Sequence, residues 1–127
     1  METMKKEMQE FDKIRQEKNG YRRLFYDDHF DLYIWYEKAG GKIIGFQIVY
    51  NSKHMQKALT WTEKEGFTHT GIDEGDRKLI NQSPMLVQDG VFEYDRVYSQ
   101  LLERIHNLDP EIQRLVVTKL DEYQRLQ

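Results

Sequence analysis

The segment at residues 66–78, GFTHTGIDEGDRK, brings one histidine and several carboxylates close together in the sequence. His69, Asp73 and Glu74 are side chains of the kinds that ligate metals or act as general acids and bases. Arg77 follows them and could bind an anionic group, because a guanidinium pairs well with carboxylate or phosphate. This segment is therefore the first candidate for a catalytic site.

The spacing of these residues argues against a metal site formed by this segment alone. Thr68, Thr70 and Gly71 disfavour a helix, and in a strand His69 and Asp73 share a face but lie about 13 Å apart. That separation is too large for both to ligate one ion. The acids that follow do not match a calcium loop, and the chain has no HExxH, GxSxG or phosphate-binding glycine motif. We therefore predict no metal and no cofactor.

A site built from distant parts of the chain remains open. Strand ends could bring His69, Asp73 and Arg77 near groups from other strands, such as Trp61 or Glu63. Residues 74–90 have the length of a loop that covers a site. This arrangement would suit a small hydrolase or isomerase-like enzyme, with His69, Asp73 and Glu74 as catalytic residues. The alternative is a solvated strand end whose charges keep the sheet edge from pairing with other chains.

Composition limits the classes of protein to consider. The 127 residues suit one domain, and 39% hydrophobic with 13% aromatic residues can form its core. A formal charge of -3 argues against nucleic-acid binding, which depends on clustered basic residues. There is no cysteine and no apolar run of about 20 residues. We expect a soluble, cytoplasmic protein that does not bind a membrane.

Residue periodicity predicts an α+β domain in four parts. Met1, Met4, Met8, Phe11 and Ile14 form a narrow apolar stripe, which predicts an amphipathic N-terminal helix over residues 1–18. Short β-rich runs at 21–73 predict a five-stranded antiparallel meander, because their connections are too short for parallel crossovers. Residues 74–90 are expected to be irregular, although PMLV could add a sixth, edge strand. Residues 92–126 predict two helices that pack on the sheet.

The expected sheet has one aliphatic and one aromatic face. A three-residue AGG loop would put Tyr33 and Trp35 on the aromatic face, with Trp35 opposite Gly45. Extending this register to the first strand adds Arg23 and Phe25 to that face. The aliphatic face then contains the following residues: Leu24, Tyr26, Leu32, Ile34, Tyr36, Ile44, Phe46 and Ile48.

Gly45 under the indole of Trp35 would leave a notch for a flat or apolar ligand, with Arg23 close enough for a cation–π contact. The predicted ligand-binding residues are Arg23, Tyr33, Trp35, Trp61 and Arg77. In the alternative interpretation, Trp35 covers the glycine as a packing device and the N-terminal helix lies across this face.

Three runs, DLYIWYEKAGGKIIGFQIVY, ALTWTEKEGFTHTGIDEG and SPMLVQDGVF, carry a resemblance to known proteins. Over residues 21–105 the chain resembles a group of small bacterial proteins whose function is uncharacterised. The resemblance implies a bacterial, single-domain protein, and it implies no activity or ligand.

Two functional hypotheses follow from the sequence. The first is a non-catalytic binding or assembly domain that uses the aromatic sheet face or the N-terminal helix, with a homodimer or another protein as partner. The second is the small enzyme described above, centred on His69 and Asp73.

Overall fold

The computed structural model describes residues 7–52, 55–72 and 94–126. Its centre is a six-stranded antiparallel sheet in which the strands follow one another in chain order. The strands are β1 (Gln9–Phe11), β2 (Tyr21–Tyr26), β3 (Phe30–Tyr36), β4 (Ile43–Ser52), β5 (Met55–Thr62) and β6 (Gly66–Ile72). The helices that follow are α2 (Tyr94–Leu102), the short 3-10 helix η2 (Ile105–Asn107) and α3 (Pro110–Leu126). The predicted meander with two C-terminal helices is confirmed.

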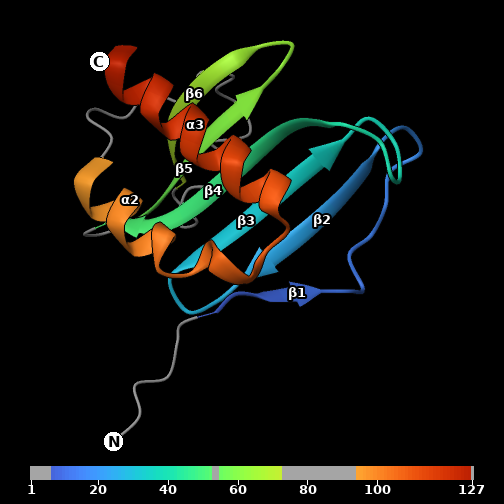
Figure 1. Cartoon of the computed structure of the whole chain (residues 1–127), viewed down its shortest axis with the longest axis horizontal. Coiled ribbons are helices and arrows are strands. Elements are labelled where there is room, and N and C mark those ends of the chain that lie inside the picture. Colours follow the sequence, from blue (N-terminus) through green and yellow to red (C-terminus); the bar gives the residue numbers. More distant parts are fainter. Residues whose placement is uncertain (1–6, 53–54, 73–93, 127) are drawn as a thin grey trace, which may run out of the picture.

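Figure 1 shows α2 and α3 lying over one face of the sheet, here called the inner face. Between these layers lies the core, which accounts for the apolar periodicity of both helices. Its fully enclosed members include Leu32, Ile34, Phe46, Ile48 and Leu59 from the sheet, and Val97, Leu101, Ile112 and Val116 from the helices. In the part of the chain that the structure describes, no helix is both long and apolar enough to cross a membrane.

The predicted register between β3 and β4 is confirmed over most of its length. Leu32 pairs with Ile48, Ile34 with Phe46, and Trp35 with Gly45. The register shifts after Trp35, so that Tyr36 pairs with Ile43 and Ile44 is the extra residue of a bulge. Gly40, with a φ of 76°, turns the chain between the two strands.

The predicted faces of β2 are wrong by one residue. Phe25 pairs with Leu32 and Arg23 with Ile34, so both belong to the inner face, and Leu24 pairs with Tyr33 on the outer face. The cause is the two-residue turn at Asp28 and His29. Asp27 Oδ1 fixes this turn by accepting hydrogen bonds from the backbone N–H groups of His29 and Phe30, both at 2.8 Å.

The predicted N-terminal helix is wrong for the residues described, because Gln9–Phe11 form strand β1 at the edge of β2. A single apolar stripe on a charged segment gives an isolated helix little stability, whereas the open edge of β2 offers backbone hydrogen bonds. Among the stripe residues that the structure describes, Met8 is the one that reaches the core. The sixth strand is therefore β1, and the PMLV segment lies outside the described residues.

Candidate functional site

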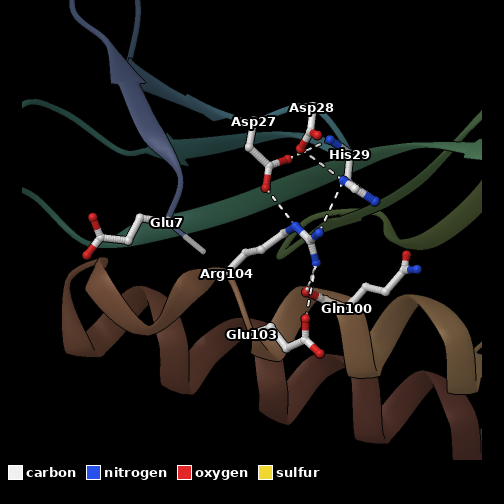
Figure 2. Close-up of a pocket in the computed structure, with 7 residues that line it drawn as sticks. All are labelled: Glu7, Asp27, Asp28, His29, Gln100, Glu103 and Arg104. Carbon is white, nitrogen blue, oxygen red and sulfur yellow. Dashed lines mark hydrogen bonds and ion pairs between the residues drawn. The ribbon is translucent and has the colours of Figure 1, made fainter. Parts of the chain in front are cut away.

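A polar pocket of about 380 Å³ lies between the β2–β3 turn and the C-terminal end of α2. Figure 2 shows its lining side chains. They are Glu7, Asp27, Asp28, His29, Gln100, Glu103 and Arg104. Carboxylates therefore outnumber basic groups in this pocket.

Arg104 is the central side chain of the pocket and is 4% exposed. Its Nε lies 2.8 Å from Oδ2 of Asp27, in an ion pair whose geometry is not that of an aligned hydrogen bond. Its Nη1 donates to the backbone oxygen of Gln100 at 2.8 Å, and its guanidinium stands over the ring of Phe30. A buried charge requires such partners, because desolvation disfavours it strongly.

The two carboxylate oxygens of Asp27 make different contacts. Oδ1 caps the β2–β3 turn, and Oδ2 faces Arg104 (Figure 2). One side chain thus fixes the turn and ties it to the segment between α2 and η2. This part of the pocket wall is positioned by the hydrogen bonds of the turn and by an ion pair that is largely shielded from water.

Asp27, Asp28 and His29 also meet a simple geometric test for metal binding, since each offers a ligand atom within 4.8 Å of the others. Arg104 weakens this interpretation. Its Nη2 lies 3.1 Å from Nδ1 of His29, and its Nε contacts Asp27. The guanidinium already supplies the positive charge that the cluster attracts, so a metal ion would have to displace it.

The Nδ1 atom of His29 has two neighbours that demand opposite protonation states. Asp28 Oδ1 at 2.9 Å can only accept a hydrogen bond, and Arg104 Nη2 at 3.1 Å can only donate one. The hydrogen bond with His29 lowers the pKa of the Asp28 carboxyl. In either protonation state, this nitrogen can therefore form a hydrogen bond with only one of the two neighbours.

The structure places His69 in the core and not at the surface. Its side chain is 1% exposed, its Nε2 lies 2.6 Å from the hydroxyl of Tyr50, and the two rings are stacked. Asp73, Glu74 and Arg77 lie outside the described residues. Trp61 is also on the inner face, where Nζ of Lys119 stands 4.4 Å above its ring. Among the residues described, His69 and Trp61 do not line the polar pocket.

Arg23 lies on the inner face and not beside Trp35. It makes a two-pronged ion pair with Glu10 of β1, at 2.9 Å for each bond, and its Nη1 donates to Asp109 before α3 at the same distance. The bond to Glu10 raises the pKa of Arg23 further above its ordinary value. Its cation–π partner is Phe25, at 4.8 Å. Arg23 therefore ties the edge strand to the helical layer.

Tyr33 and Trp35 do lie on the outer face, opposite the helices. Sheet register aligns Phe11, Leu24 and Tyr33 in one row across β1, β2 and β3, and Trp35 stands in the next row beside Arg22. Phe11 is 42% exposed. The β1–β3 side of this face is therefore a partly exposed aromatic surface, here called the aromatic surface. Farther across the sheet, Val49 and Ala58 are buried.

The predicted notch at Gly45 is filled by Trp35. A Cβ placed on Gly45 would lie 3.1 Å from Cε3 of the indole and 2.8 Å from the backbone oxygen of Trp61. Glycine is thus needed for close packing, as in the alternative interpretation, with the indole in the place of a ligand. A smaller hollow of about 160 Å³ is lined by Trp35 together with Gln16, Tyr21 and Ile44.

Asp27, His29 and Arg104 are missing from the site residues that the sequence predicts. Two signals could have pointed to them. The sequence DDH lies in one of the short connections between the predicted strands, and Arg104 stands at helical spacing from Val97 and Leu101, on the apolar face of the first predicted C-terminal helix. A buried arginine requires an acidic partner, and the turn supplies one.

Comparison of the chain with models of protein families, with curated proteins and with solved structures gives no match. Its function is therefore inferred from the arrangement of its own residues.

Proposed function

We propose that this protein is a non-catalytic binding or assembly domain whose contact site is the aromatic surface on β1–β3. One observation carries the proposal. Phe11, Leu24 and Tyr33 stand in register on the sheet face opposite to α2 and α3, with Trp35 in the adjacent row. Rings that lie partly exposed on a sheet face are typical of protein contacts, because they bury a large area at a small entropic cost.

The shape of this surface favours a protein over a small molecule. The indole of Trp35 packs directly on Gly45, so the predicted notch gives no pocket for a flat ligand. The hollow next to it is about 160 Å³, below the usual range for ligand pockets of roughly 300–1,000 Å³. A protein partner of ordinary interface size buries about 800 Å² on each side and needs no pocket. The absence of cysteine is compatible with the proposed cytoplasmic location.

The enzyme hypothesis has weaker support. The imidazole of His69 is enclosed by the core and engaged with Tyr50, so it has no exposed nitrogen to exchange protons with a substrate. Asp73 and Glu74 lie outside the described residues, and the site around His69 and Asp73 stays a hypothesis. Arg77 as an anion-binding residue stays one as well.

Site-specific photo-crosslinking in cells tests the proposal. A photoreactive amino acid at position 33 should give a discrete adduct with a protein, because Tyr33 lies at the centre of the aromatic surface. The matched control is position 118, an exposed position on α3, which should give none. Circular dichroism should show that both variants are folded. Adducts from position 118 with none from position 33 would exclude the aromatic surface as the contact site.

A further inference from the structure

Asp31 is a partly buried carboxylate on the outer face, and no cation among the described residues pairs with it. It belongs to β3 and stands in register with Tyr26 on one side and Val49 on the other. Within residues 7–52, 55–72 and 94–126, no ion pair or hydrogen bond of its side chain is found. Desolvation, followed by the charge of Asp27, raises the pKa of Asp31. A positively charged partner would stabilise the ionised form of such a partly buried carboxylate.

Arg22 lies on the same face at the opposite end of the aromatic surface. It pairs with Trp35 across β2 and β3, and its side chain is 28% exposed. Its Nε donates to the backbone oxygen of Arg15, and its Nη2 lies 4.0 Å from the carboxylate of Glu17, which is 72% exposed. A pair this long and this exposed contributes little. The guanidinium therefore has donors for a stronger partner.

The positions of these two charges have a simple relationship. Arg22 is two residues before Leu24 on β2, and Asp31 is two residues before Tyr33 on the antiparallel β3. The row formed by Leu24 and Tyr33 thus lies midway between the opposite charges, which are separated by about 13 Å along the strands. A half-turn about an axis that crosses the strands at this row would place each charge over the position of the other.

We infer that the partner of the aromatic surface is a second copy of this chain, packed face to face so that Arg22 of each subunit pairs with Asp31 of the other. This inference rests on the proposed function. A single two-fold axis gives both ion pairs and brings the two Tyr33 rings together at the centre. Such an isologous contact closes on itself, and two sheets packed with nearly aligned strands form an ordinary sandwich.

Charge-reversal variants test the pairing directly. Arg22→Asp would place two acids opposite each other at both ends of the contact, and Asp31→Arg would place two arginines there. Each variant should bind itself at least about tenfold more weakly than the wild-type chain, as analytical ultracentrifugation over a range of concentrations would show. Arg114→Asp, a reversal at an exposed position of α3, is the control and should leave the dimer unchanged.

Mixing the two variants gives the decisive result. A heterodimer of Arg22→Asp with Asp31→Arg has an attractive pair at each end, so the mixture should dimerise more tightly than either component does alone. The double variant Arg22→Asp/Asp31→Arg should dimerise with itself for the same reason. If the single variants weaken the dimer but neither combination restores it, the inferred pairing is wrong.

A wild-type chain that stays monomeric at every concentration would also overturn the inference. The crosslinking experiment then separates the two proposals. An adduct from position 33 with a different protein would leave the binding domain in place and remove the homodimer, whereas an adduct of twice the chain mass would support both. Circular dichroism of every variant excludes misfolding as the cause of a lost dimer.

Discussion

Nε of Arg104 lies 2.8 Å from Oδ2 of Asp27, and this ion pair joins the β2–β3 turn to the segment between α2 and η2. The side chains are only 4% and 11% exposed. Arg104→Met would keep much of the apolar stem but leave the Asp27 carboxylate without its cation. We expect a loss of about 3–5 kcal/mol in the free energy of unfolding, measured by urea denaturation.

Asp27→Asn provides the matched control for this pair. The amide oxygen can still cap the turn, while the negative charge facing Arg104 is lost. In the double variant with Arg104→Met, no buried charge is left without a partner. The double variant should therefore be destabilised by less than the sum of the two single variants. Strictly additive losses would show that the two side chains are not energetically coupled.

The hydrogen bond between Tyr50 and His69 gives a second prediction. Tyr50→Phe keeps the stacked ring but removes the hydroxyl that lies 2.6 Å from Nε2 of His69. Because both groups are buried, the free energy of unfolding should fall by about 1–3 kcal/mol. Thermal and urea denaturation would measure this loss. An unchanged stability would mean that the contact is not an important part of the core.

The sequence predicts the centre of this sheet well because its faces have different chemistry. On β3 and β4, aliphatic residues alternate with Tyr33, Trp35 and Gly45, and only one register satisfies both faces. On β2, Leu24 and Phe25 are adjacent and both apolar. Their order does not reveal which one faces the core, and the choice depends on how Asp27 closes the turn.

The polar pocket and β1 could not be predicted for a different reason. Two partners of Arg104, Asp27 and His29, come from a turn about 75 residues earlier in the chain, so no local pattern connects them. The stripe of Met8, Phe11 and Ile14 has helical spacing, but the strand is formed by backbone bonds to β2, which side-chain periodicity does not record. Both the polar pocket and β1 therefore depend on contacts between distant parts of the chain.

Gly45→Ala tests whether Trp35 packs directly on the glycine. The new methyl group would lie 2.8 Å from the backbone oxygen of Trp61 and 3.1 Å from the indole of Trp35, so the sheet or the ring must shift. We expect a loss of about 1–3 kcal/mol in the free energy of unfolding. Thr68→Ala, at an exposed position of the same face, should change it by less than about 0.5 kcal/mol. Equal effects for the two variants would contradict the close packing.

Asp31 should make the stability of the isolated subunit vary with pH in the acidic range. Desolvation raises its pKa in the folded state above the ordinary value of 3.8. Between the pKa of Asp31 in the unfolded chain and its higher pKa in the folded chain, the folded chain binds the proton more readily. The free energy of unfolding that Asp31 contributes therefore decreases as pH rises through this window. Urea denaturation at a concentration that keeps the chain monomeric should show this slope, and Asp31→Asn should remove it. A slope that persists in Asp31→Asn would assign it to another group.

Tyr94 should produce the corresponding effect at alkaline pH. Burial of the phenol, together with its hydrogen bond to Asp121 at 2.9 Å, raises the pKa of Tyr94 to about 12 from an ordinary value of 10.0. The folded chain thus keeps this proton when the unfolded chain has lost it. Stability due to this group is complete below pH 10 and decreases as pH rises from there towards 12. Tyr94→Phe removes the hydrogen bond between α2 and α3, so its free energy of unfolding at neutral pH should be about 1 kcal/mol lower than that of the wild type. Its stability should also fall less steeply between pH 10 and 12. Tyrosinate absorbance and urea denaturation across the same pH range would measure both effects, and parallel curves for the wild type and Tyr94→Phe would contradict this role of Tyr94.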